Sequence, residues 1–314
     1  IHVTKYEDYQ PVDLPKDGLS GHKEALVDDI FFQMVPDAGT QVAGVQSGEY
    51  DVVLDIPNEY YEQVSSNSDL KTDVTMYGAL SLAFNKHEGI FTDPKMRQAV
   101  NAALDMDSIL LAAFANEDLF EAGASYMQKE QVAWYSEAGS EHYNQNDPEK
   151  AKQLLEEAGY NGEEIVFLTS RDYDHIYNSS VVVQQQLADI GMNVELAVYD
   201  WATFTDVRED PSQWSLYSSG NAAQPTPTGW GFFGHDYFDG PNDDKTNELL
   251  LEIERSTSQE EAKAYWDELQ AYLWETVPMV PYGYFPKITV TSNAVEGYEY
   301  FNATPIFWNV TNSN

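Results

Sequence analysis

The sequence predicts an α/β fold in which strands and helices alternate along the chain. Its clearest evidence lies at 163–200, where "EEIVFLTS", "SSVVVQQQLADIG" and "NVELAVYD" read as strand, helix and strand. Two strands joined through a helix normally lie parallel in one sheet. The chain has 314 residues, 42% of them hydrophobic, which is enough for a large core or for two lobes.

The segments before 163 also alternate. Apolar stretches predict strands at 25–35, 50–56 and 78–85, and helices are expected at 37–48, 58–67, 91–114 and 146–160. Asp93 suits the N-cap of the helix at 91–114, and Pro94 suits its first turn, where the missing N–H does no harm. Gly48 and Gly159 are expected to end two of these helices.

The segments after 200 continue the pattern. A short helix is expected at 201–209 and a strand at 214–219. Two amphipathic helices follow at 245–256 and 258–277, and 278–292 reads as extended strands. The predicted fold class is therefore α/β throughout.

Charge and cysteine content exclude several functions. The chain carries 53 acidic and 16 basic residues, a net charge of −37, so nucleic acid and anionic membrane surfaces are poor partners. A hydrated acidic surface favours solubility in saline or alkaline surroundings, and a cation-binding role is the lesser alternative. With no cysteine, the chain cannot form disulfides, thiolate zinc sites, iron–sulfur clusters or a thiol nucleophile.

An uncharged stretch, "SLYSSGNAAQPTPTGWGFFG" at 215–234, contains the pattern G-x-G-x-x-G. A dinucleotide loop needs a helix after the glycines and a close approach of backbone to phosphate. Here Trp230, Phe232 and Phe233 fill the variable positions, and a polar segment follows instead of a helix. The pattern is therefore interpreted as accidental, and no nucleotide is expected.

No cofactor or metal is expected either. The six histidines lack zinc-binding spacing, and the acidic stretch 236–244 lacks the spacing of a calcium loop, although a weak cation contact there stays open. Carboxylates are too abundant for any pair to indicate a glycosidase. The chain is expected not to be an enzyme, with an extracellular glycoside hydrolase as the alternative.

Four stretches carry a resemblance to a known family. They are "LVDDIFFQMVPDAGTQVAGVQSGEYDVV", "LAFNKHEGIFTDPKMRQAVNAALD", "YNQNDPEKAKQLLEEAGYNGEEIVFLTS" and "VVVQQQLADIGMNVELAVYDWATFTDVRED". The chain resembles the extracellular solute-binding proteins of the peptide/nickel class, which feed ABC importers and include dipeptide- and oligopeptide-binding proteins. "PIFWNV" near the end fits the same family.

The resemblance implies a periplasmic-binding-protein-like C-terminal lobe with a mixed sheet flanked by helices. It places 18–284 in that lobe, and 1–17 and 285–314 in a first lobe whose greater part would precede Ile1. The expected partners are a small solute and the permease subunits of an ABC importer, with a membrane reached only through an anchor in the absent N-terminal part. The protein is expected to be a bacterial monomer outside the cytoplasm, either periplasmic or at the cell surface.

The resemblance also supplies candidate ligand-binding residues. Trp201 and Arg208 fit the family pattern, whereas Ser218, Asn221 and Gln224 stand where peptide-binding members carry Arg, Trp and the Asp that pairs with the peptide's α-amino group. Gln224 offers a neutral amide instead of a counter-charge. We therefore expect a neutral solute such as an oligosaccharide; the alternative is a peptide held by an acid elsewhere. The full candidate set is Trp201, Arg208, Tyr217, Ser218, Asn221, Gln224 and Trp230.

Overall fold

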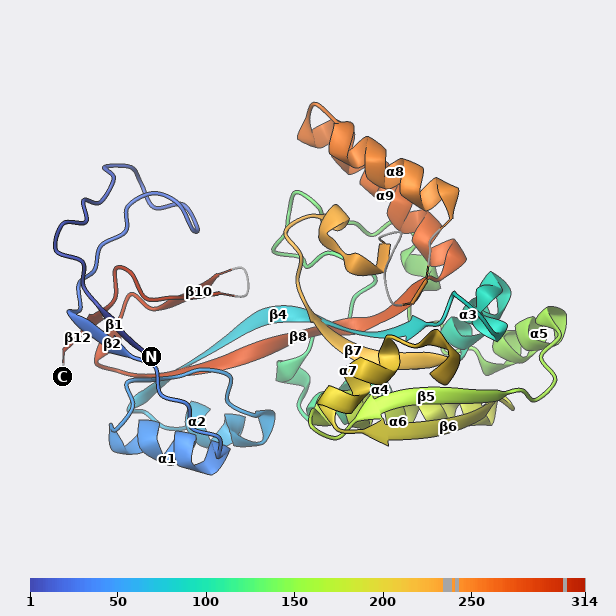
Figure 1. Ribbon diagram of the computed structural model, residues 1–314, viewed down its shortest axis with the longest axis horizontal. Helices are drawn as coiled ribbons and strands as arrows, with labels where there is room; N and C mark the ends of the chain where they lie inside the picture. The colour runs from blue at the N-terminus through green and yellow to red at the C-terminus, as the bar shows by residue number, and fades with distance from the viewer. Residues whose placement is uncertain (234–238, 241–242, 302–303, 314) are drawn as a thin grey trace. The chain divides into compact units, whose positions relative to one another are not determined.

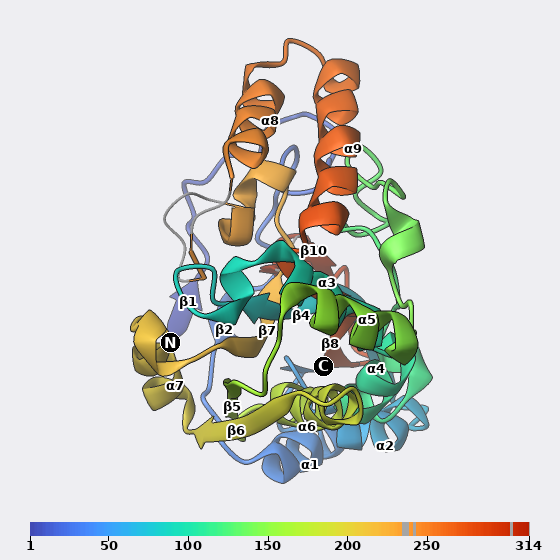
Figure 2. The same cartoon turned by 90° about the vertical axis from the view of Figure 1, so that its right-hand side faces the viewer.

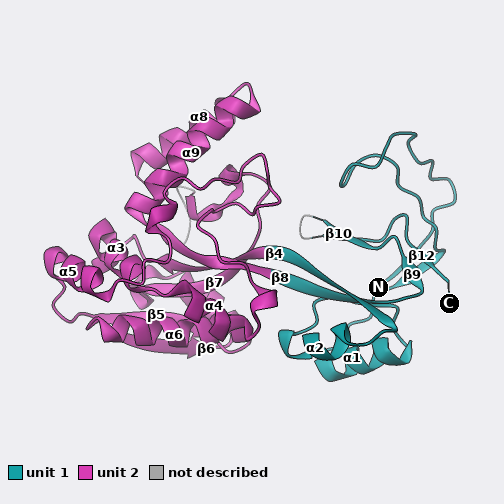
Figure 3. Ribbon diagram, turned by 180° about the vertical axis from the view of Figure 1, so that it is seen from behind, with its two compact units in different colours: residues 1–77, 286–314 teal, residues 78–285 magenta. Residues whose placement is uncertain are grey.

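A computed structural model describes residues 1–233, 239–240, 243–301 and 304–313 (Figure 1). Its largest sheet has six strands in the order β3-β8-β4-β7-β5-β6. The chain divides into two compact units (Figure 3). Unit 1 comprises 1–77 and 286–314, and unit 2 comprises 78–285, so the long strands β4 (Leu70–Phe84) and β8 (Met279–Ser292) contribute to both.

The sheet of unit 2 is mixed, as the family resemblance implied. β5 (Glu164–Ser170) and β6 (Asn193–Tyr199) are parallel, and α6 (Asp174–Asp189) joins them and packs on the sheet. β7 (Leu216–Ala222) runs parallel to β5 and antiparallel to β4. The predicted strand–helix–strand unit is confirmed.

Six further α-helices occur in the described part of unit 2. Their bounds are Pro94–Ala103 (α3), Met106–Phe114 (α4), Pro148–Ala158 (α5), Trp201–Arg208 (α7), Asp244–Arg255 (α8) and Gln259–Thr276 (α9). α3 packs on α5, α4 packs on α6, and Figure 2 shows α8 beside α9. The predicted start of α3 is confirmed, because the Asp93 side chain accepts a hydrogen bond from Lys95 N and Pro94 follows it.

One predicted helix is two helices. The stretch 91–114 breaks at Leu104, whose backbone is extended, and α4 starts anew from an N-cap at Asp105. Tertiary partners hold the break: Gln186 Oε1 accepts from Asp105 N, and Asn144 Oδ1 accepts from Met106 N. These donors are the free N–H groups of a helix start, which the periodicity of the apolar residues did not reveal.

Unit 1 is built from short elements. β1 (His2–Thr4) pairs with β2 (Asp29–Phe31), and β3 (Val52–Val53) pairs with β8. The strand predicted at 25–35 is thus limited to three residues, in a two-stranded sheet too small to bury its apolar side chains. The remaining elements are α1 (Ala38–Ser47), α2 (Tyr61–Ser65), β9 (Val295–Glu296), β10 (Glu299–Phe301), β11 (Thr304–Ile306) and β12 (Thr311–Asn312).

The core of unit 2 holds α9 against the irregular segment 120–145. Trp266 and Trp274 are fully buried, and their indole N–H groups donate to the carbonyl oxygens of Trp134 and Ala124. The side chain of Gln270, also fully buried, makes four hydrogen bonds to the same segment. Within the described part of the chain, no helix has the length and apolar character needed to cross a membrane.

Candidate functional site

The carboxyl ends of the parallel strands β5, β6 and β7 meet at one edge of the sheet of unit 2. Ligands of open α/β sheets commonly bind at this edge, because the loops that follow the strands converge there. We call the residues that follow or end these strands the strand-end surface. It comprises Asp172, Tyr173 and His175 after β5, Trp201 after β6, and Asn221 and Gln224 from β7 and its loop.

Trp201 is held firmly at this surface. Its backbone N–H donates to Asp172 Oδ2 at 2.7 Å, and its ring meets Tyr173 edge-to-face with 4.8 Å between centroids. Asp200 caps α7 by accepting from Thr203 N, and that hydrogen bond lowers the pKa of the Asp200 carboxyl. Both contacts leave the half-buried Trp201 ring at the start of the helix, next to the exposed Tyr173.

Arg208 lies at the other end of α7 and packs inward. Its guanidinium lies 5.8 Å from the Phe204 ring centroid and 5.5 Å from that of Tyr217. Tyr217 is fully buried and meets Phe204 edge-on. These contacts give Arg208 and Tyr217 a supporting position behind Trp201, which itself stacks on Phe204.

Ser218 faces the core of unit 2. It is fully buried, and its hydroxyl shares a 3.1 Å hydrogen bond with the hydroxyl of Tyr282, a residue of β8. Burial raises the pKa of Tyr282, so that phenol stays neutral. A serine at this position therefore leaves no charge under the strand-end surface.

Asn221 and Gln224 are half-buried and offer amides at the surface. Asn221 Nδ2 reaches Ser219 O at 3.5 Å, and Gln224 Nε2 donates to Ala222 O at 3.1 Å. The backbone carbonyl oxygen of Gln224 accepts from Gln131 Nε2 at 2.6 Å, which connects the loop to the segment 120–145. Both amides keep further hydrogen-bonding capacity.

Trp230 is buried, near Phe232, and is not a surface ring. Its indole Nε1 has no hydrogen-bond partner among the described residues. Phe233 packs edge-on against Tyr126, so the aromatic residues of the G-x-G-x-x-G stretch anchor the loop in the core of unit 2. The loop therefore lacks the open glycine backbone that a pyrophosphate needs.

Sequence reasoning did not include His175 among the site residues. Its half-buried ring stacks on Phe114 at a centroid distance of 5.8 Å and lies tilted against Phe285 at 5.3 Å. A Cβ added at Gly220 would lie 3.1 Å from His175 Nε2, so the glycine of β7 leaves room for this ring. The sequence could have indicated this residue. His175 lies in the first turn of α6, directly after β5, and ligands of α/β folds commonly bind at such positions.

Comparison with known proteins identifies the family. The sequence model of a protein family, described as "Bacterial extracellular solute-binding proteins, family 5 Middle", matches residues 1–244. The chain belongs to this family. A probable peptide ABC transporter periplasmic-binding protein of Sinorhizobium fredii is 30% identical over 327 residues, covering 97% of this chain and 60% of the relative.

Solved structures of other binding proteins share the fold. The oligopeptide-binding protein of Bacillus subtilis in complex with a nonapeptide has a TM-score of 0.72 at 20% identity, covering 90% of this chain and 59% of that one. The binding protein AgaA from A. tumefaciens in complex with agropinic acid has a TM-score of 0.77 at 21% identity, covering all of this chain and 64% of that one. The chain thus spans about three-fifths of the length of each of these three proteins.

Family 5 is a family of solute-binding proteins rather than enzymes, as the sequence predicts for this chain. The periplasmic-binding-protein-like fold with a mixed sheet is likewise confirmed. No cluster of three or more metal-ligating side chains occurs among the residues the structure describes. Most of the acidic stretch 236–244, and His235 beside it, lie outside those residues.

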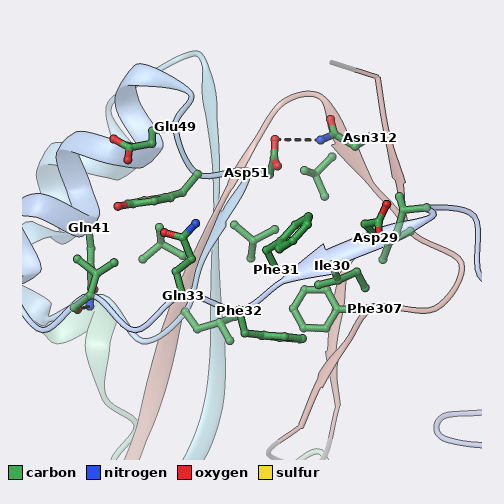
Figure 4. Close-up of a pocket in the computed structure, with 18 residues that line it drawn as sticks. Asp29, Ile30, Phe31, Phe32, Gln33, Gln41, Glu49, Asp51, Phe307 and Asn312 are labelled. Atoms are coloured by element: carbon green, nitrogen blue, oxygen red, sulfur yellow. Dashed lines mark hydrogen bonds between the residues drawn. The ribbon is translucent and has the colours of Figure 1, made fainter. Parts of the chain in front are cut away.

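Unit 1 also contains pockets. One of about 430 Å³ is bordered by β2, β3, Gln41 of α1 and the C-terminal segment (Figure 4). Phe31, Phe32 and Phe307 line it, and the Asp51 carboxylate accepts from Asn312 Nδ2 at its margin. None of the candidate ligand-binding residues borders this cavity. Its open aromatic lining is typical of a surface that another polypeptide segment covers.

Proposed function

We propose that this chain is the solute-capturing part of a receptor for a bacterial ABC importer, located in the periplasm or at the cell surface, and that its solute is neutral, such as an oligosaccharide. Family membership supports the receptor role, and the relative in Sinorhizobium fredii is named a probable peptide ABC transporter periplasmic-binding protein. The choice of a neutral solute rests on the chemistry of the strand-end surface.

The observation that carries this choice is the absence of charge in the segment 215–233, which contains β7 and the loop that follows it. Residues 215–233 contain no ionisable carboxylate, ammonium or guanidinium group, and Gln224 presents an amide. A solute ammonium in a closed site needs a counter-charge, since an unpaired buried charge costs several kcal/mol. Amides instead match hydroxyl groups, because each offers both donors and an acceptor.

The aromatic rings of the same surface suit the apolar faces of sugar rings. Tyr173 is exposed and Trp201 half-buried, and their edge-to-face contact fixes the angle between the two rings. Fixed rings bind with little loss of conformational entropy. Amides beside rings are therefore the recognition elements that we assign to this site.

A peptide is the second candidate, and Asp172 favours it. This exposed carboxylate lies next to Trp201 and uses Oδ2 to accept the Trp201 N–H. It could still face the α-ammonium of a peptide, in place of the acid that position 224 lacks. The two candidates therefore differ in which side chain, Gln224 or Asp172, meets the solute.

Calorimetry of the full-length receptor tests the proposal. We expect micromolar binding of cello- or xylo-oligosaccharides and no heat from tri- to pentapeptides. Asp172→Asn should leave that affinity within about threefold, because no ammonium is present. Micromolar peptide binding that Asp172→Asn weakens at least tenfold would establish the peptide instead, and binding of neither class would contradict both candidates.

We further infer that unit 1 belongs to the first lobe of the receptor. Its apolar side chains are unusually open, with Met34 95% exposed and Phe31 65% exposed, and the relatives contain a substantial further portion that this chain does not match. The boundary that we propose between the lobes lies near 78 rather than 18, because 18–77 are part of unit 1. Coexpression with the remaining part should abolish binding of a hydrophobic dye to unit 1; unchanged dye binding would contradict this assignment.

A further inference from the structure

Two consecutive residues that follow β4, Asn85 and Lys86, hold the chain at the start of the uncharged segment 215–233 and at Asp239 beyond it. Asn85 holds the end that precedes β7: its backbone N–H donates to Ser215 O at 2.9 Å, and its side-chain Nδ2 donates to Pro211 O and Trp214 O at 2.6 and 2.9 Å. Asn85 is buried, so these hydrogen bonds are shielded from water. They fix where β7 begins.

Lys86 holds the chain beyond the segment. Its backbone N–H donates to Asp239 O at 2.6 Å, and its Nζ donates to Asp239 Oδ2 at 2.9 Å. The side chains are 6% and 0% exposed, so this is a buried ion pair. Asp239 Oδ1 has no hydrogen-bond partner within the described parts of the chain, which makes Lys86 the principal counter-charge that the structure shows for this carboxylate.

Backbone geometry supports the same contact. Gly240 has a φ of +103°, and a Cβ there would lie 2.8 Å from His87 N. Only glycine adopts this conformation without strain and also allows such a close approach. Residues 239–240 therefore contact residues 86–87 through the Asp239 side chain and through the backbone of Gly240.

Burial lowers the pKa of Lys86 and raises the pKa of Asp239, so for each group desolvation outweighs the attraction of the other. A buried ion pair of this kind contributes little net stability compared with apolar residues of similar volume. The pair instead fixes the position of the chain, because the two buried charges compensate each other only when Lys86 and Asp239 lie side by side.

We propose that Asn85, Lys86 and Asp239 form a clasp that positions the segment 215–233, and with it Asn221 and Gln224 of the strand-end surface. None of the three is assigned to contact the solute. They act on binding by fixing the chain at the start of the segment and at Asp239 beyond it. This role rests on the proposed solute site, but the clasp itself can be tested without any solute.

Hydrogen exchange of the full chain provides that test. Lys86→Met should accelerate amide exchange in 216–233 at least tenfold and leave β5 and α6 unchanged. Lys95→Met is the matched control, because the Lys95–Glu157 pair is exposed and lies in the same unit. The control should change exchange less than twofold throughout unit 2.

The double variant Lys86→Met/Asp239→Asn separates loss of the clasp from the cost of leaving the buried Asp239 carboxylate without a counter-charge. It should regain the urea midpoint that Lys86→Met loses, yet keep the rapid exchange in 216–233. Equal acceleration throughout unit 2, no acceleration in 216–233, or normal exchange in the double variant would each overturn the clasp.

Binding then links the clasp to the site. With cellotetraose, xylotetraose and tetra-alanine as probes of the full-length receptor, Lys86→Met should weaken whichever binds about tenfold, and Lys95→Met should not. Unchanged affinity in Lys86→Met would overturn the positioning role. If no probe binds the wild-type receptor, the proposed solute fails, whereas the exchange data still decide whether the clasp exists.

Discussion

Replacing Gly78 with alanine is expected to destabilise unit 2 by about 3 kcal/mol. β4 and β7 approach so closely that a Cβ at Gly78 would lie 2.0 Å from the backbone oxygen of Asn221 and 2.8 Å from its carbonyl carbon. The obstacle is backbone in the middle of a sheet, so no side-chain rotation can relieve it. The two strands must separate at Asn221, and solute binding should weaken together with stability.

Urea unfolding followed by tryptophan fluorescence measures this effect, because every tryptophan except Trp308 lies in unit 2. Gly123→Ala is the matched control: its nearest contact would be an ordinary 3.8 Å to Tyr284. We expect the control to keep or gain stability, by at most about 1 kcal/mol. A Gly78→Ala variant as stable as the control would show that the strands are not packed this closely.

Replacing Gln270 with leucine is expected to cost unit 2 about 3–5 kcal/mol. Gln270 Nε2 donates to the carbonyl oxygens of Ser136 and Ala138, at 2.8 and 2.9 Å, and Oε1 accepts from Ser125 Oγ and Tyr126 N. Leucine has a similar size but satisfies none of these groups. The irregular segment 120–145, which contacts Gln224 through Gln131, would then lose four of its hydrogen bonds to α9.

The control for this variant is Gln185→Leu. Gln185 is an exposed residue of α6 whose amide donates to Asp189, one turn later, at 2.8 Å. We expect a change within about 0.5 kcal/mol for this surface position. Equal midpoints for the two variants in chemical denaturation would refute the role of Gln270 as the buried attachment point.

Much of the fold of unit 2 could be predicted from local sequence. The strand–helix–strand unit and the cap at Asp93 follow from patterns within a few residues, which is the range over which periodicity and capping act. The break at Leu104 depended instead on Gln186 and Asn144, which are distant in sequence. The short β2 depended on a sheet with only two strands, which its apolar sequence could not indicate.

The candidate site was predictable in place but not in detail. The alignment with the family led to Trp201, Asn221 and Gln224, which lie at the carboxyl edge of the sheet. It could not reveal that Ser218 and Tyr217 are buried or that Arg208 packs inward. These orientations depend on the tertiary structure, in which Tyr217 contacts α7 and Ser218 contacts Tyr282 of β8. His175, Asp172 and the clasp at Lys86 required the tertiary structure.

The most direct test of a neutral solute is to identify what the full-length receptor carries when it is purified from its own cells. Native mass spectrometry would give the mass of the bound molecule, and its fragmentation after release would give its class. Our account predicts a solute without an ammonium group at neutral pH, with masses and fragments of linked sugars. A bound peptide with a free α-amino group would contradict it.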